Sequence, residues 1–112
     1  MRILKKMLKG ICVYWEPSGR VGEDGQPIFL LAEDIKCRWE EGGELNVDFD
    51  GEEFVPMHTV YVGIDLKRGG YLMDVEAKDL EGPELAEGAF RIRKYERIPT
   101  LNYKKFLRVA YL

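Results

Sequence analysis

Two runs, Ile11-Cys-Val-Tyr-Trp15 and Ile35-Lys-Cys-Arg-Trp-Glu40, decide the fold class of this chain. The first is rich in the β-branched and aromatic residues that favour strands. In the second, Ile35, Cys37 and Trp39 alternate with charged residues, and a period of two is typical of a strand with one buried face. Both runs therefore predict strands.

Strand character recurs on both sides of these runs. Leu45, Val47 and Phe49 alternate with polar residues up to Asp50-Gly51, the usual residue pair of a tight hairpin turn. The return strand of this hairpin is expected through Phe54 and Val55, with Pro56 interrupting the ladder. Further strands are predicted over residues 28–31, 60–62, 71–75, 89–98 and 106–112.

The remaining segments predict loops and little helix. Residues 16–27 are dense in turn-forming residues, and residues 63–88 contain Gly69-Gly70 and Gly82-Pro83. Residues 1–9 predict a basic arm or a short helix, and residues 84–87 predict one helical turn. The two long segments are the natural places for loops that reach neighbouring molecules.

These elements predict an all-β fold, a small antiparallel β-barrel of about six or seven strands with long inter-strand loops. A sandwich is the alternative, and a barrel is preferred because it protects strand edges in a short chain. The length of 112 residues fits a single domain over residues 1–112.

Composition bears on membrane association, on the compartment in which the protein is made and on disulfide formation. No apolar run approaches the roughly 18 residues that span a bilayer, and the N-terminus lacks the apolar stretch of a signal peptide. Synthesis in the cytoplasm and no membrane partner are expected. Cys12 and Cys37 lie in apolar strands, where free thiols behave as small buried hydrophobes, so a disulfide is not expected.

Charge is distributed unevenly along the chain. The net charge is −3, but residues 1–15 and 91–112 are basic and residues 16–90 are acidic. Such asymmetry favours an assembly in which unlike faces meet, or an acidic face beside a polyanion that must not adhere. A solvated surface of mixed charge is the alternative.

Residues with catalytic or ligand-binding chemistry are scarce. His58 is the only histidine and Ser18 the only serine, and His58 is expected to be a partly exposed or hydrogen-bonded structural residue. The two cysteines are isolated, and residues 48–53 resemble a calcium loop only weakly because glycine stands at the fourth position. We expect no enzyme activity, no cofactor and no metal.

Nucleic-acid binding is a separate hypothesis for the C-terminal part. Basic residues there are interleaved with Phe90, Tyr95, Tyr103 and Phe106, which suits a platform for base stacking. Aromatic residues are also ordinary barrel-core material, and the pI near 5.3 is far from the basic balance of such domains.

Several blocks of the sequence resemble, in order, a family of small virion proteins of tailed bacteriophages, the head-completion or head-tail joining proteins. The blocks cover nearly the whole chain and include Cys12-Val-Tyr-Trp15, Gly25-Gln-Pro27, Ile35-Lys-Cys-Arg-Trp39, Asp50-Gly-Glu52, Val60-Tyr-Val62, Gly69-Gly-Tyr-Leu72 and Leu107-Arg-Val-Ala-Tyr-Leu112.

The resemblance implies a stopper in the neck of the virion. Such a protein forms a homo-oligomeric ring below the portal and its adaptor, retains packaged double-stranded DNA without reading its sequence, and offers the tail a docking surface. The alternatives are another head-tail joint component, such as an adaptor or tail terminator, and a small nucleic-acid-binding β-barrel.

Two sets of residues are then candidates for function. The first is an acidic hairpin over residues 40–53, whose carboxylates would face the channel and repel DNA phosphates: Glu40, Glu41, Glu44, Asp48, Asp50, Glu52 and Glu53. The second is a basic interface to partner proteins: Arg91, Arg93, Arg97, Lys104 and Lys105. Residues 16–27 and 63–88 are expected at ring contacts, and a partner's tail could add a strand to an open edge.

Overall fold

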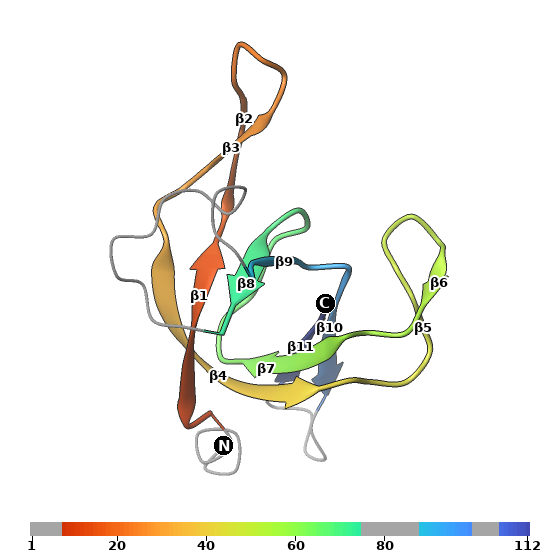
Figure 1. The fold of residues 1–112 in the computed structure, drawn as a ribbon. Coiled ribbons are helices and arrows are strands. Elements are labelled where there is room, and N and C mark those ends of the chain that lie inside the picture. Colours follow the sequence, from red (N-terminus) through yellow and green to blue (C-terminus); the bar gives the residue numbers. More distant parts are fainter. Residues whose placement is uncertain (1–7, 75–87, 100–105) are drawn as a thin grey trace.

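The computed structural model describes residues 8–74, 88–99 and 106–112 (Figure 1). These residues form strands and no helix, which confirms the all-β prediction. The main sheet is antiparallel and has seven strands: β1 (Gly10–Trp15), β4 (Glu33–Glu41), β7 (His58–Val62), β8 (Tyr71–Met73), β9 (Phe90–Arg91), β10 (Lys94–Pro99) and β11 (Phe106–Tyr111). Their order is β10-β11-β7-β4-β1-β8-β9.

Strand β4, which contains the second of the two decisive runs, is the centre of the sheet. Its first half pairs with β1, where Cys12 lies opposite Ile35, and its second half pairs with β7, where Trp39 lies opposite Val60. Ile35 and Cys37 are buried while Lys36 and Arg38 are exposed, as the alternation predicts.

The sheet curls into a half-barrel, and a two-residue link explains why its edges come together (Figure 1). Strands β9 and β10 stand at opposite ends of the strand order, yet only Ile92 and Arg93 separate them in sequence. The N–H of Ile92 donates to the carbonyl of Gly70 at 3.0 Å, and the N–H of Arg93 donates to the carbonyl of Tyr111 at 2.8 Å. The link therefore joins the β8 side to the β11 side.

The hydrophobic core lies inside this curl. Ile92 is fully buried there, and the hydroxyl of Tyr14 accepts a hydrogen bond from the N–H of Lys67 at 2.9 Å. Burial raises the pKa of Tyr14 and keeps this hydroxyl neutral. The core cluster comprises Cys12, Tyr14, Ile35, Cys37, Val60, Val62, Leu66, Leu72, Ile92, Ala110 and Leu112.

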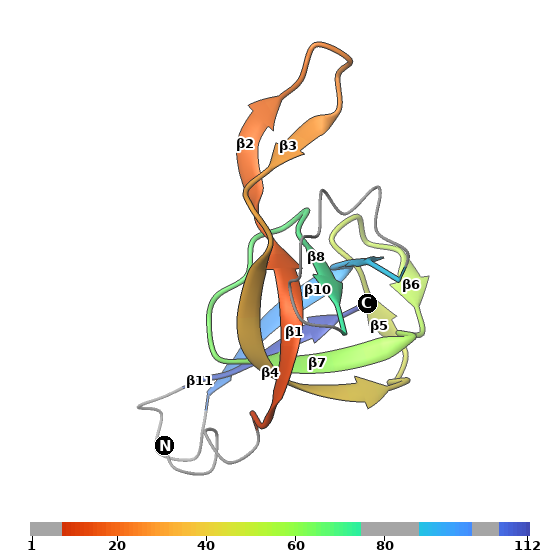
Figure 2. The ribbon, with the colours of Figure 1, turned by 60° about the vertical axis from the view of Figure 1, so that its left-hand side comes forward.

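Two hairpins project from the half-barrel, and each continues a strand pair of the main sheet (Figure 2). We call the first the arm; it contains β2 (Pro17–Val21) and β3 (Pro27–Phe29) and extends the β1–β4 pair. The acidic hairpin contains β5 (Asn46–Val47) and β6 (Glu53–Phe54) and extends the β4–β7 pair. The two hairpins therefore leave from opposite ends of β4.

The structure differs from the sequence predictions in two places. Residues 16–27 were expected to be a loop but form most of the arm. The strand expected over residues 89–98 divides into β9 and β10, because the chain crosses from one sheet edge to the other at Ile92. The seven strands of the main sheet confirm the predicted six or seven, and the two projecting hairpins add four short strands among the described residues.

Other predictions agree with the structure or lie outside it. Pro56 interrupts the chain between β6 and β7, as expected. The predicted N-terminal helix or arm, the helical turn over residues 84–87, and Lys104 and Lys105 fall wholly or mainly outside the described residues.

Candidate functional site

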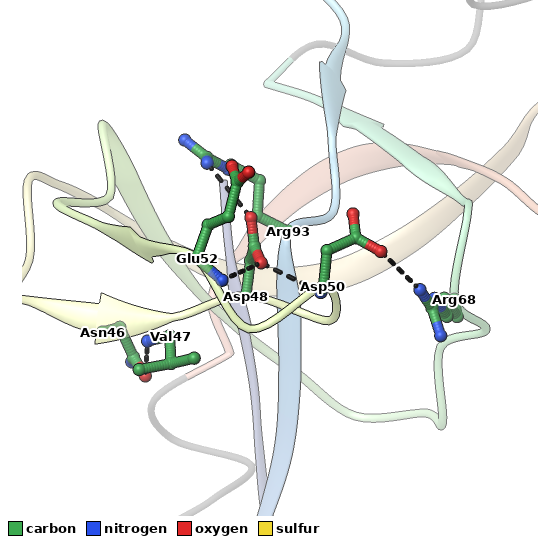
Figure 3. Close-up of polar contacts among 7 residues, drawn as sticks. All are labelled: Asn46, Val47, Asp48, Asp50, Glu52, Arg68 and Arg93. Atoms are coloured by element: carbon green, nitrogen blue, oxygen red, sulfur yellow. Dashed lines mark hydrogen bonds and ion pairs between the residues drawn. The ribbon is translucent and has the colours of Figure 1, made fainter.

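The turn of the acidic hairpin is organised around the carboxylate of Asp48 (Figure 3). Its Oδ1 accepts hydrogen bonds from the backbone N–H groups of Asp50 and Glu52, both at 2.9 Å. Gly51 adopts a left-handed conformation with φ of 83°, which glycine tolerates without strain. The Asp50-Gly51 pair therefore lies in a hairpin turn as predicted, within a connection over residues 48–52.

Arg93 attaches this turn to the barrel. Its guanidinium lies 3.3 Å from Oδ2 of Asp48 and stacks over the ring of Phe54 at 4.2 Å from the centroid. The backbone N–H of Glu52, assisted by Arg93, holds the pKa of Asp48 below its ordinary value of 3.8. Asp48 is thus a structural anchor of the hairpin and not a free surface charge.

Two other members of the predicted acidic set are also paired. Asp50 lies 3.0 Å from the guanidinium of Arg68, which stacks over the Phe49 ring at 5.0 Å from its centroid. Glu40 pairs with Arg38 at 2.9 Å along β4. Both pairs are solvent-exposed and contribute little to stability.

The remaining four carboxylates form the open acidic surface of the hairpin. Glu41, Glu44, Glu52 and Glu53 are exposed, and none of them forms an ion pair with another described residue. A hollow of about 450 Å³ beside β4 contains Glu41 and Glu44 together with Tyr61 and Tyr111. The predicted acidic set therefore has three members paired with arginines of this chain and four exposed members without an ion pair among the described residues.

The predicted basic interface is divided by the fold. Arg91 is exposed on β9, whereas Arg93 turns to the acidic hairpin. Arg97 lies on β10, 3.6 Å from the carboxylate of Asp65. The other two members, Lys104 and Lys105, lie outside the described residues.

A cluster centred on Asp65 was not predicted from the sequence. Its carboxylate accepts a hydrogen bond from Arg108 and another from the hydroxyl of Tyr95, both at 2.8 Å. Arg97 and Arg108 stand directly opposite each other on β10 and β11, and the Asp65 carboxylate weakens the repulsion between these two like charges. The hydrogen bonds from Arg108 and Tyr95 lower the pKa of Asp65, while burial and the carboxylate raise the pKa of Tyr95 to about 12.

His58 is a hydrogen-bonded, half-buried residue, as expected. Its Nδ1 accepts a hydrogen bond from Nε1 of Trp39 at 3.0 Å, and its ring meets the Phe90 ring edge-on at a centroid distance of 4.7 Å. An imidazole nitrogen occupied by an indole N–H is held in place as part of the packing.

The two cysteines are buried and free, as predicted. They lie on adjacent strands inside the barrel, and contact with Cys37 together with burial raises the pKa of the Cys12 thiol. Over residues 8–74, 88–99 and 106–112, no group of three or more metal-ligating side chains comes together. No helix in the described part of the chain has the length and apolarity to cross a bilayer.

Comparison of the chain with protein-family models gives no match, and a search of curated proteins finds none that matches.

Proposed function

We propose that the protein is a structural component of the tailed-bacteriophage neck, a ring-forming stopper below the portal and adaptor that retains packaged DNA and presents a surface to the tail. The proposal starts from the ordered resemblance of the sequence to head-completion proteins. A small barrel-like fold with projecting hairpins supports it, because ring proteins need a rigid body and extensions that reach neighbours.

One observation carries the proposal furthest: the acidic hairpin is rigidly anchored yet negatively charged outside. Asp48 and Phe54 tie it to the barrel through Arg93. Glu41, Glu44, Glu52 and Glu53 remain uncompensated by the other described residues. Carboxylates beside a channel repel the phosphate backbone, so a duplex can pass without adhering.

The internal ion pairs argue against the nucleic-acid-binding alternative. Phosphate binding needs available cations, but Arg93, Arg97 and Arg108 already face carboxylates of this chain. Tyr95 binds Asp65, and Phe90 packs against His58, so two of the expected stacking residues are engaged. Among the described members of the basic set, Arg91 is the most available to a portal, adaptor or tail protein.

The decisive experiment adds the purified protein to DNA-filled heads that lack this component. Electron microscopy would show a ring at the portal vertex, and nuclease treatment would show whether DNA stays inside. We expect both. A protein that does not bind heads contradicts the stopper proposal, and salt-sensitive binding to free DNA instead would favour the nucleic-acid-binding barrel.

Charge-neutralised variants test the role of the hairpin within the assembled ring. The triple variant Glu41→Gln, Glu44→Gln, Glu52→Gln should still form rings but slow DNA ejection, because the channel becomes less repulsive. The control is Glu33→Gln, Asp34→Asn, which removes two exposed acidic charges at the start of β4, outside the acidic hairpin and the segments expected at ring contacts. Equal ejection rates for the two variants would refute a channel-facing hairpin.

The partner interface is tested by Arg91→Glu. This variant leaves the Arg93 contacts with Asp48 and Phe54 intact, so weakened docking of adaptor or tail is not an effect of hairpin collapse. Unchanged docking would remove Arg91 from the interface.

A further inference from the structure

We propose that copies of this chain associate head to tail, with an apolar patch on the arm of one copy packed against an apolar patch on the acidic hairpin of the next. This inference rests on the proposed ring and names the two surfaces that form its subunit contact. Each surface is defined by the exposed apolar side chains of one projecting hairpin.

The arm patch consists of Ile28 and Leu30, with exposed fractions of 46% and 49%. Val21, which pairs with Pro27, alternates to the other face of the arm. Phe29 faces back to the body, where its ring meets Tyr71 edge-on at 5.5 Å. Because side chains alternate along an extended chain, Ile28 and Leu30 face away from that contact. A two-stranded hairpin that projects with its apolar residues in water is only marginally stable alone, so it is suited to packing on another surface.

The hairpin patch consists of Leu45, Val47, Val55 and Met57, with exposed fractions of 64%, 44%, 63% and 64%. Asn46 pairs with Phe54 and Val47 pairs with Glu53 across the hairpin. The first pair faces the barrel, where Phe54 is buried and Asn46 accepts a hydrogen bond from Lys94 at 2.6 Å. The second pair therefore faces outward, and continuing the register puts Leu45 and Val55 on the same outer face.

The positions of the patches favour a head-to-tail contact over a symmetric one. The arm and the acidic hairpin extend from opposite ends of β4, which has nine residues and so spans roughly 26 Å. Figures 1 and 2 show them projecting in different directions. Two distinct surfaces on one chain, each matching the other in character, generate a heterologous interface that closes into a ring when the rotation allows.

Charge at the two patches is complementary. Arg20 lies beside Ile28 in the β2–β3 register, and Glu53 lies beside Val47 in the β5–β6 register. Both side chains are exposed, and neither forms an ion pair with another described residue. A cation beside one apolar patch and a carboxylate beside the other would fix which surface meets which. Each copy of the chain carries one such cation and one such carboxylate, so a second copy supplies the matching charge for each patch.

Cross-linking tests the contact directly. Leu30→Cys and Val55→Cys are prepared separately, mixed and oxidised; the native Cys12 and Cys37 are buried and should not react. We expect a disulfide-linked dimer from the mixture and none from either variant alone. A dimer from Leu30→Cys alone would overturn the head-to-tail contact in favour of arm-to-arm pairing, and no cross-link at the highest soluble concentration would overturn self-association through these patches.

Sedimentation equilibrium gives a second test. Leu30→Asp and Val55→Asp should each weaken self-association at least about tenfold, whereas Ile64→Asp, which changes an exposed side chain in neither patch, should not. A mixture of the two patch variants should form a heterodimer and nothing larger, because only one intact pair of surfaces remains. Failure of the mixture to associate contradicts the proposal.

Charge-reversal variants test whether Arg20 and Glu53 pair across the contact. Arg20→Glu and Glu53→Arg should each weaken association, and the double variant should restore most of it. Lack of rescue would remove this ion pair from the interface.

These outcomes are separable from those of the neck proposal. Heads that bind a ring of the patch variants as well as the native protein would overturn the subunit contact and leave the stopper role standing. Association of the purified chain through both patches without any binding to heads would do the reverse.

Discussion

The arm and the acidic hairpin turn in the same way but are held differently. In the arm, the N–H of Gly22 donates to the carbonyl of Gln26, and the N–H of Gly25 donates to that of Gly22. In the acidic hairpin, Asp48, Gly51 and Glu52 repeat both bonds at the same spacing. Gly25 and Gly51 have φ values of 81° and 83° and each follows an aspartate.

Their attachments to the barrel have little in common. The acidic hairpin is fixed by the Arg93 guanidinium on Asp48 and Phe54, and by the Phe49 N–H, which donates to the carbonyl of Arg93 at 3.2 Å. The arm has the Phe29–Tyr71 ring contact and its continuity with β1 and β4. A shared turn sequence therefore fixes local geometry, while tertiary contacts decide whether a hairpin belongs to the cooperative fold.

The largest difference should come from the aromatic anchors. Phe54 is 6% exposed, so Phe54→Ala should lower the free energy of unfolding by about 3 kcal/mol, whereas Phe29→Ala in the half-buried arm contact should cost about 1 kcal/mol. Urea unfolding followed by tryptophan fluorescence measures both. Equal losses would mean that the two hairpins are equally integrated.

The turn glycines provide a matched pair. An added Cβ meets nothing within 4 Å at either Gly25 or Gly51, so alanine introduces only the backbone strain of about 1–2 kcal/mol. Gly51→Ala should lower global stability by that amount. Gly25→Ala should leave the free energy of global unfolding nearly unchanged and speed amide exchange in the arm. If Gly25→Ala lowered the free energy of unfolding as much as Gly51→Ala, the arm would be as much a part of the cooperative fold as the acidic hairpin.

Of the two hairpins, acid should loosen the acidic hairpin and not the arm. The pKa of Asp48 is lower in the folded protein than its ordinary value of 3.8, so the folded state binds fewer protons near that pH than the unfolded state does. The contribution of Asp48 is therefore complete above pH 4 and lost as pH falls through the lowered pKa. Asp48→Asn should be less stable at neutral pH and lose less than the native protein on acidification to pH 2. Parallel stability-pH curves would exclude Asp48 as the titrating anchor.

The smallest effect is expected at the exposed ion pair of the acidic hairpin. The side chains of Arg68 and Asp50 are 59% and 65% exposed, and Arg68→Met should change stability by no more than about 0.5 kcal/mol. Thermal unfolding of the variant and the native protein at low and high salt would detect this change in stability. A loss approaching that of Phe54→Ala would show that surface pairs, and not the buried anchor, hold the hairpin.

Much of the sheet follows from period-two patterns that a single sequence displays. Ile35 and Cys37 alternate with charges because one face of β4 is buried, and Asp50-Gly51 marks its turn through backbone chemistry alone. The arm was missed although Asp24-Gly25 offers the same signal, because the surrounding glycines and prolines dilute any alternation. The strand division at Ile92 has no local signal, since it depends on the two sheet edges meeting.

The sequence shows which charged residues make up the candidate site but not which of them form ion pairs with one another. An acidic segment over residues 40–53 is visible in the sequence, but its partner Arg93 lies 45 residues beyond Asp48. Asp65 meets Tyr95 and Arg108 from 30 and 43 residues away. Such contacts depend on the order of strands in the sheet, which the sequence does not reveal. The sequence therefore indicates a basic face, whereas in the fold most of the described arginines there lie beside carboxylates of the same chain.

The prolines of the arm have a consequence for how the free protein behaves. Pro17 and Pro27 lie in β2 and β3, and a proline lacks the N–H that an incoming strand would need. An extended hairpin with apolar side chains would otherwise be a template for edge-to-edge growth into fibres. Because the edges of the arm are blunted, another molecule can engage the arm only by side-chain packing, and free copies of the chain should not add to one another strand by strand.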